Sequence, residues 1–297
     1  MNWKGILVLT ISATLFSTAG FAQANLLNAK TPAEVGKKTE AQIEADNDEP
    51  LPYGYVDDRD ILWSKTVWER IDLDERVNFP FYYPIDTIGI GQARRSLYHV
   101  LVTNIKNGNI DEVYVDSYFT EKRNFSDLEA TLQKVDTTDL GYEQLNAGEQ
   151  VSAEYINRRN LTAADIQEYR IKGVWYFDKR QGELKYRLLG IAPVAPDVNF
   201  IDSEQSDLVE LFWVWFPSAR DILHQAKAFN DHNSSRPISF DQLLNARRFD
   251  AVIYKEENVQ GDRAIKDYIT DNAMFQLLEA QRIKENIRNK EQDMWSY

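Results

Sequence analysis

The segment E-L-F-W-V-W-F, residues 210–216, constrains the fold more than any other stretch because it is apolar on two sides. Alternate side chains of a strand point to opposite faces of a sheet. One face would carry Leu211, Trp213 and Trp215, and the other Phe212, Val214 and Phe216. A strand of this kind has to be covered on both sides. We therefore predict a buried strand at Glu210–Phe216 with other elements packed on each face.

Four further strands are predicted from apolar and β-branched runs that are bounded by turn residues. They span Glu112–Phe119, Lys172–Asp178, Leu184–Ala192 and Phe249–Lys255. The second and third of these strands are predicted to form a hairpin around Arg180-Gln181-Gly182.

Helix starts are predicted where a hydroxyl residue precedes an acid or amide by three positions, which is the capping-box pattern. Such patterns begin at Ser126, Thr162, Ser218 and Ser239. An amphipathic stripe predicts another helix at Gln92–Asn107, ended by Gly108. The C-terminal stretch Asp262–Asn289 is also helical, and its stripe shifts near Thr270–Ala273, which favours two helices. The charged run that begins at Val67 and ends before Phe79 is interpreted as a candidate helix.

The predicted fold class is α+β, because helices and strands intermix without a strict alternation of the two. Mixed helices and short, mostly antiparallel strands would form one main globular domain, residues 61–297. A weak internal similarity, helix–link–strand at Leu101–Tyr114 and again at Phe240–Tyr254, raises the hypothesis of an internal duplication.

The N-terminus has the pattern of an export signal. Lys4 precedes the apolar run Gly5–Phe21, and Ala22-Gln23-Ala24 forms a cleavage site. We expect cleavage after Ala24 and a periplasmic location; the alternative is an uncleaved N-terminal anchor. Residues 25–60 are predicted to be a flexible acidic tail because large apolar residues are sparse there. No later segment has the length and apolar character of a membrane span.

Composition argues against several classes of function. The net charge of −13 opposes binding to nucleic acid or anionic lipid, and it suits a basic partner or simply solubility. The absence of Cys excludes disulfides and a lipid-modified N-terminal Cys, and the three His share no zinc-binding spacing. No serine-hydrolase or dinucleotide-loop motif is present. We therefore predict no catalytic residue, no cofactor and no metal site.

Aromatic residues make up 12% of the chain, and core packing is expected to account for most of them. Aromatic and Arg side chains also anchor protein–protein interfaces. Six residues are candidates for contact with a partner: Trp68, Tyr82, Tyr83, Trp213, Trp215 and Arg220. The alternative is a periplasmic carbohydrate-active or carbohydrate-binding protein, in which paired carboxylates act on a glycan or aromatic rings stack on sugar.

Three groups of residues are specific when they are taken together. They are Val67-Trp68-x-Arg70-Ile71-Asp72-Leu73 with Asn78-x-Pro80-x-Tyr82-Tyr83-Pro84, Ile171-Lys172-x-x-Trp175-Tyr176-Phe177-Asp178-Lys179 with Gly190-Ile191-Ala192-Pro193, and Leu211-Phe212-Trp213-Val214-Trp215-Phe216-Pro217-x-Ala219-Arg220 with Ile253-Tyr254-Lys255-Glu256-x-Asn258-Val259. Together they resemble the gliding motility protein GldN, called PorN in non-gliding relatives. The resemblance covers about Trp63–Tyr268.

The resemblance implies a structural, non-enzymatic subunit of the type IX protein secretion and gliding motility machinery, on the periplasmic side of the outer membrane. The partners that it implies are a GldK- or PorK-like outer-membrane lipoprotein, further copies of the chain in a large ring, and GldL- and GldM-like motor proteins. It implies no catalytic residue, no cofactor, no nucleic acid and no direct transmembrane anchoring. The N-terminal tail is expected to order against a neighbouring subunit or the lipoprotein.

Overall fold

The computed structural model describes residues 31, 40, 48–86, 88, 94–148, 150, 152–200, 207–230 and 237–295. The chain divides into two compact units, Met1–Glu49 and Pro50–Tyr297, and the second unit is described below. The predicted signal peptide and nearly all of the predicted tail before residue 48 lie outside the described residues. Among the described helices, none combines the length and the apolar character that crossing a membrane requires.

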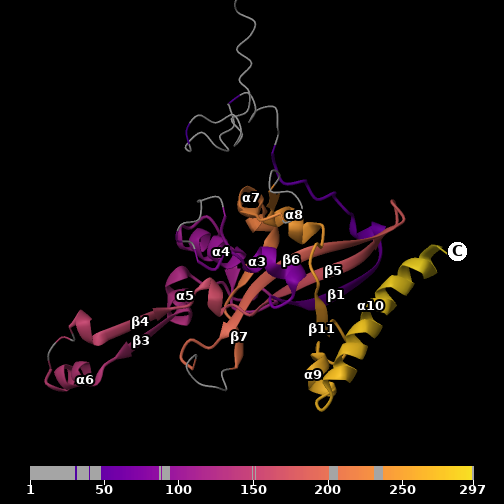
Figure 1. Cartoon of the computed structure of the whole chain (residues 1–297). Helices are drawn as coiled ribbons and strands as arrows, with labels where there is room; N and C mark the ends of the chain where they lie inside the picture. Colours follow the sequence, from indigo (N-terminus) through magenta and orange to yellow (C-terminus); the bar gives the residue numbers. More distant parts are fainter. Residues whose placement is uncertain are drawn as a thin grey trace, which may run out of the picture. The chain divides into compact units, whose positions relative to one another are not determined.

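A seven-stranded antiparallel sheet forms the centre of this unit (Figure 1). Its strands are β1 (Ile61–Asp72), β2 (Val113–Tyr114), β5 (Glu168–Asp178), β6 (Glu183–Pro196), β7 (Leu208–Glu210), β8 (Trp213–Trp215) and β11 (Val252–Glu256). Their order is β11-β1-β5-β6-β8-β2, and β7 pairs with the end of β6. The predicted α+β class with antiparallel strands is therefore confirmed, although the three central strands are long, at 12, 11 and 14 residues.

Strand β1 includes Val67–Asp72, the first part of the charged run that was expected to be helical, so that prediction is wrong there. It lies inside the sheet between β11 and β5. Val67 is buried on one face and Trp68 on the other. The charge that suggested a helix is accommodated because Glu69 forms an ion pair with Arg247 from a distant loop. This segment is a strand and not a helix because it pairs with a neighbouring strand along each of its edges.

Strands β5 and β6 confirm the predicted hairpin and extend it at both ends. Their turn includes Gly182, whose φ of 66° lies in the left-handed region that glycine adopts at little cost. Since β5 also pairs along nearly the whole length of β1, this hairpin and β1 form the frame on which the other elements pack.

Several helices enclose the main core against the sheet. They are α3 (Phe79–Tyr82), α4 (Leu97–Lys106), α7 (Phe216–Gln225) and α8 (Phe240–Asn245). Phe212 and Phe216 belong to this core, whereas Trp213 packs in a separate cluster with Trp68. The predicted burial of both faces of residues 210–216 is therefore confirmed, although only Trp213–Trp215 is a strand and Phe216 already begins α7.

Two of the four predicted helix caps are observed. Ser239 caps α8, and Thr162 forms a capping box at a 3-10 helix. Helices α7 and α5 (Phe125–Leu132) begin before the predicted caps Ser218 and Ser126. The 3-10 helices are η2 (Asp58–Asp60), η3 (Arg76–Asn78), η4 (Ala153–Tyr155) and η5 (Ala163–Asp165).

The C-terminal stretch forms two helices, as predicted: α9 (Ile265–Tyr268) and α10 (Ala273–Trp295). Helix α10 is attached by apolar packing, in which Ile283 joins a buried cluster with Val67 of β1 and Ile253 of β11. This second cluster is separate from the main core.

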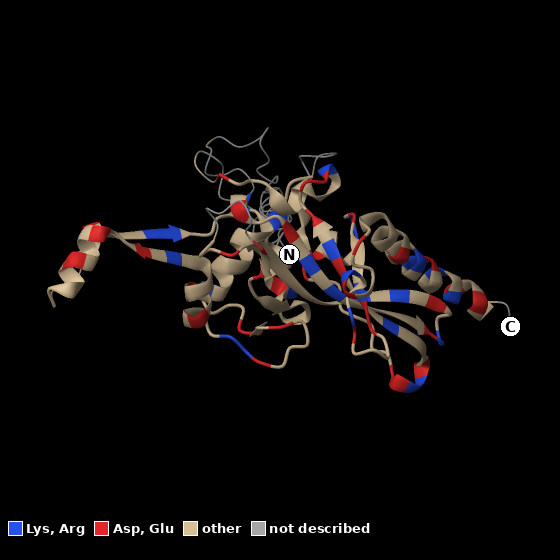
Figure 2. Ribbon diagram, turned by 90° about the horizontal axis from the view of Figure 1, so that it is seen from below, with Lys and Arg blue, Asp and Glu red and all other residues tan. Residues whose placement is uncertain are grey.

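A projecting segment, here called the arm, leaves the body between β2 and β5. It consists of β3 (Gln133–Thr137), α6 (Asp139–Asn146) and β4 (Ile156–Asn160), and β3 and β4 form a two-stranded sheet of their own. Figures 1 and 2 show the arm extending from α5 away from the main sheet, with α6 at its tip. The sequence predictions did not include this hairpin.

Candidate protein-interaction site

The structure buries Trp68 and Trp213, two of the six predicted contact residues, which are 1% and 0% exposed. Lys172 and Lys255 lie on the strands that flank Trp68, with their Nζ atoms 4.8 and 4.4 Å from its ring centre. Burial, and then the charge of Lys255, lower the pKa of Lys172. Trp68 is therefore held by cation–π contacts within its own sheet, and its ring has almost no exposed surface for a partner.

Trp215 is half-buried beneath the loop of residues 115–122. Phe119 of that loop packs edge-on against Trp215, with ring centres 4.8 Å apart. A Cβ atom at Gly190 would lie 2.5 Å from the Phe119 ring, so the sheet leaves room for the ring at this position. Phe119 has a φ of 59°, which is uncommon outside glycine. The loop therefore covers this face of the sheet and much of Trp215.

Arg220 is an internal anchor. Its guanidinium donates to the Asp241 carboxylate at 2.8 and 3.2 Å and to the carbonyl of Leu51 at 2.7 Å. The ring of Tyr53 lies 4.1 Å from the guanidinium carbon. Burial lowers the pKa of Arg220, but hydrogen bonding to Asp241 and the nearby negative charges together raise it above its ordinary value, so the side chain stays charged. Arg220 thus contacts a segment of its own chain.

That segment, residues 50–57, is here called the strap. Three further side chains of the body bind it. Arg187 donates to the carbonyl of Gly54 at 3.1 Å, and Arg180 donates to the carbonyl of Tyr55 at 2.8 Å. Asn245 accepts a hydrogen bond from the hydroxyl of Tyr53 at 2.9 Å. The last part of the predicted tail is therefore bound along the body.

Among the six predicted contact residues, Tyr83 has the most exposed side chain, at 46%, and it lines a groove of about 940 Å³. Segments far apart in the sequence build this groove: η3 and α3, the strand pair β9 (Lys227–Ala228) and β10 (Ile238–Ser239), and α8. Its lining consists of Arg76, Val77, Phe79, Pro80, Tyr83, Phe229, Asn230, Ile238, Leu243 and Arg248. Tyr82 is half-buried beside it, and its ring packs against Tyr83 at 4.9 Å.

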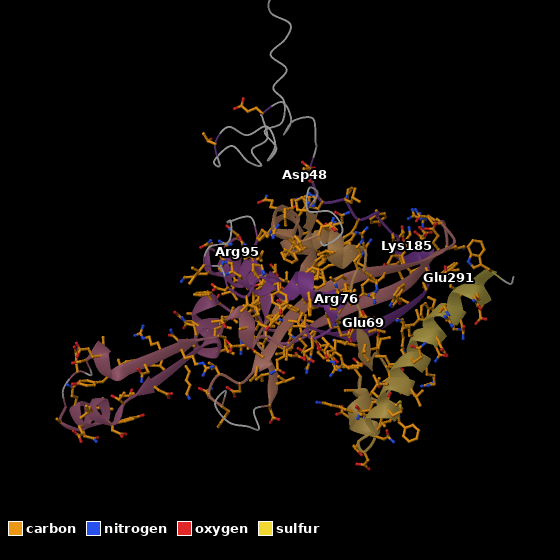
Figure 3. All side chains as sticks on the ribbon, viewed as in Figure 1. Asp48, Glu69, Arg76, Arg95, Lys185 and Glu291 are labelled. Atoms are coloured by element: carbon orange, nitrogen blue, oxygen red, sulfur yellow. The ribbon has the colours of Figure 1, made fainter. Side chains whose placement is uncertain are left out.

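The groove is apolar, and its charged lining residues are arginines. Val77 and Phe229 are 52% and 40% exposed, which is unusual for large apolar side chains gathered at one place. Arg76, labelled in Figure 3 beside α3, and Arg248 line the same groove. Within the described part of the chain, neither guanidinium forms an ion pair or a hydrogen bond. The lining therefore suits an apolar segment that carries carboxylates.

Two carboxyl groups stand next to the groove without pairing with these arginines. Asn78 donates to the carboxylate of Glu75 at 3.5 Å and accepts from the backbone N–H of Asp250 at 3.0 Å. Partial burial, and then the charges of Asp250 and Asp72, raise the pKa of Glu75. The polar contacts of these residues are with Asn78 and with each other, and among the described residues none is with Arg76 or Arg248.

A buried ion pair on strand β1 had no counterpart among the sequence predictions. Glu69, also labelled in Figure 3, is 3% exposed and accepts two hydrogen bonds from Arg247, both at 2.9 Å. The Arg247 guanidinium lies 4.1 Å from the ring centre of Tyr186. Burial lowers the pKa of Arg247, but the charge of Glu69 and hydrogen bonding to it raise the pKa, and the net shift is upward, so the guanidinium stays charged. No local pattern marked this pair, because 178 residues separate its members.

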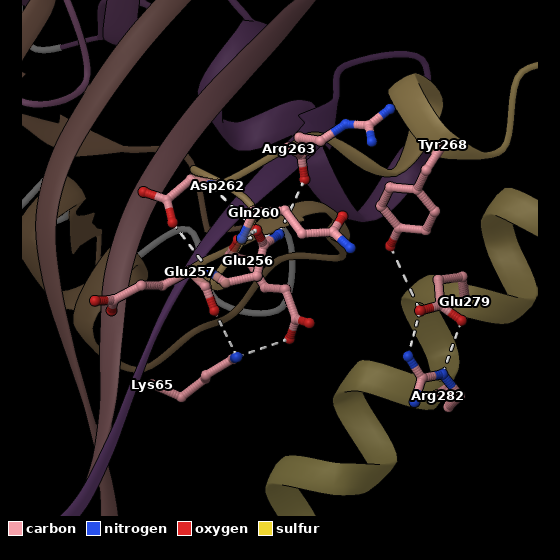
Figure 4. A network of polar contacts seen from close by, with 10 residues as sticks. Lys65, Glu256, Glu257, Gln260, Asp262, Arg263, Tyr268, Glu279 and Arg282 are labelled. Atoms are coloured by element: carbon pink, nitrogen blue, oxygen red, sulfur yellow. Dashed lines mark hydrogen bonds and ion pairs between the residues drawn. The ribbon is translucent and has the colours of Figure 1, made fainter.

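Figure 4 shows a surface network that fixes β11 and α10. Lys65 donates to the carbonyl of Glu257 at 2.6 Å and pairs with Glu256 at 3.2 Å. On α10, the ion pair with Arg282 lowers the pKa of Glu279. These are structural contacts. Figure 2 shows acidic and basic residues interspersed over the ribbon, and the described residues include no group of His, Asp or Glu able to hold a metal ion.

The chain was compared with known proteins. A family model described as gliding motility associated protein GldN matches residues 56–296, which is most of the chain. No curated protein matches the chain. The matched region starts within the strap and includes the sheet, the groove, the arm and α10.

Proposed function

The chain belongs to the GldN family, and from that premise we propose that it is a structural periplasmic subunit that forms a large ring with an outer-membrane lipoprotein. Family membership makes it a component of the gliding motility and type IX secretion machinery, and the family is structural rather than enzymatic. Beyond family membership, we propose that the chain is exported and that its signal peptide is cleaved. We also propose that it assembles in a ring with the lipoprotein and is linked to the motor proteins.

The observation that carries the proposal is the family match over nearly the whole folded unit. The groove supports it, because an exposed apolar surface of this kind is typical of a subunit that remains to be covered by another protein. Permanent assemblies bury about 2,000 Å² or more per interface. A ring subunit contacts a neighbour on each side, so it needs more than one such surface.

The test is purification of the affinity-tagged chain from the cell envelope. We expect the chain to elute as a large complex that contains a lipoprotein, and we expect cells that lack the chain to lose type IX export. The signal peptide is tested by sequencing the N-terminus of the purified chain, which should begin at Asn25.

The opposite result is a monomeric chain without a lipoprotein in cells whose type IX export is unaffected by its loss. Retention of that monomer on peptidoglycan or polysaccharide, abolished by substitution of Tyr83, would support the carbohydrate-binding alternative instead.

A further inference from the structure

We propose that the tip of the arm of one copy docks into the groove of a second copy. This inference deepens the proposed function, because it specifies how neighbouring copies would contact one another. The arm and the groove are different surfaces, so the contact is heterologous: each copy supplies one tip and one groove. Such contacts generate a ring if the rotation between copies closes, and an open filament if it does not.

The arm has large apolar side chains that the described part of the chain leaves exposed. Val135, Leu140, Tyr142 and Leu145 are 54%, 56%, 51% and 57% exposed. Three of them lie on α6, at the end of a two-stranded sheet. A two-stranded hairpin is marginally stable in water unless another element packs on it. The arm therefore presents an apolar surface that a partner would both cover and stabilise.

Charge identifies the groove as the complementary surface. Helix α6 carries Asp139 and Glu143 and no basic residue. The charged lining residues of the groove are Arg76 and Arg248. The net charge of the whole chain is −13, so the charged lining of the groove is opposite in sign to the chain as a whole. Apolar and charged groups of the tip therefore both find counterparts in the groove.

The direction of the arm favours a second copy over the same chain. Figures 1 and 2 show α6 at the far end of the arm, whereas α3 and α8, which line the groove, lie on the body. The arm extends away from that body, so its own tip does not meet its own groove. A second copy supplies the tip without any change of fold.

The natural absence of cysteine makes the contact directly testable. We would combine Leu145→Cys in the arm with Tyr83→Cys in the groove and oxidise the purified full-length chain. We expect disulfide-linked dimers and larger species. The matched control replaces Leu145→Cys with Leu278→Cys, since Leu278 on α10 is 55% exposed and lies outside both surfaces. The control should give few cross-links.

Charge reversal provides a second, independent readout. We expect Arg248→Glu and Glu143→Arg each to weaken self-association of the chain at least about tenfold in sedimentation experiments. Combining both substitutions should restore part of the lost affinity, since the charges are again opposite. Both positions are exposed, and an unchanged thermal unfolding curve would show that the fold is intact.

These measurements use the chain alone, so they are separate from capture of the lipoprotein. The cross-link would also be tested in the complex purified from the envelope. Absence of the Leu145→Cys to Tyr83→Cys cross-link in both preparations would overturn the inference even if the lipoprotein is captured. Equal cross-linking by the Leu278→Cys control would overturn it as well. A cross-link without any captured lipoprotein would support the inference and contradict the proposed function.

Discussion

At the residue scale, the buried pair of Glu69 and Arg247 shows how this fold accepts charge inside the sheet. A buried carboxylate is costly unless it is paired and hydrogen-bonded. Arg247 supplies two hydrogen bonds, and its guanidinium stacks on Tyr186. Removal of one partner would leave the other buried without compensation.

We predict that Arg247→Ala lowers the free energy of unfolding by about 3 kcal/mol, because Glu69 would lose its counter-charge. The matched control is Arg282→Ala, which breaks an exposed pair with Glu279 and should cost less than about 1 kcal/mol. Urea unfolding of both variants measures the difference. Equal losses in the two variants would show that the buried pair has no special role.

Whether a single residue lies in the core or at the surface was the hardest property to predict from sequence. Aromatic chemistry selected Tyr83 as a candidate contact, and its side chain is exposed, but the same chemistry also selected Trp68 and Trp213, which are buried. An indole ring packs equally well in a core or an interface. The residue type therefore does not show whether a tryptophan lies inside the fold or at a contact with a partner. Arg220 was selected for the same reason, and it binds the strap.

At the element scale, the frame of β1, β5 and β6 depends on close approach between strands. A Cβ atom at Gly173 would lie 2.2 Å from the ring of Tyr186 on the neighbouring strand. Tyr186 is fixed there by Arg247 and by Trp175, whose ring centre is 5.0 Å away. Glycine in this strand therefore makes space for a neighbouring ring.

We predict that Gly173→Ala lowers the free energy of unfolding by about 1 to 3 kcal/mol, because Tyr186 cannot move without breaking its contacts. Gly54→Ala is the control: no atom lies within 4 Å of its added Cβ, so its effect should stay within about 0.5 kcal/mol. Thermal unfolding monitored by tryptophan fluorescence distinguishes the two. A neutral Gly173→Ala would mean that Tyr186 is free to shift.

Elements with local signals were predictable, and elements without them were not. The hairpin of β5 and β6, two caps and the division of α9 from α10 follow from turn residues and periodicity. Strand β1 depends on pairing with the distant strands β5 and β11, so the charge in its sequence was misleading, and the strands of the arm had no clear local signal. The strands of the two similar segments, β2 and β11, do lie at the two edges of the sheet, and the duplication stays a hypothesis.

At the scale of the whole molecule, the strap joins the start of the folded unit to its core. Its binding site includes Arg220, Asp241 and Asn245 from α7 and α8. These contacts place the beginning of the folded unit near residue 50, about ten residues before the start that composition suggested.

We predict that a chain of residues 50–297 unfolds at the same temperature as residues 25–297, because the strap is retained in both. A chain of residues 58–297 should lose about 2 kcal/mol, since Arg220 then lacks the Leu51 carbonyl and the Tyr53 ring. Differential scanning calorimetry compares the three lengths. If residues 58–297 were as stable as the longer chains, the strap would contribute nothing to the fold.

The sequence by itself determined which segments had to be buried, where the main hairpin turns, and which family the chain resembles. These properties follow from residues that are adjacent or a few positions apart. Only the tertiary structure decided the strand β1, the strap, the arm and the groove. Their contacts join residues such as Leu51 and Arg220, which are 169 positions apart. Side-chain chemistry fixes what a residue can bind, but the path of the whole chain fixes which partner it meets.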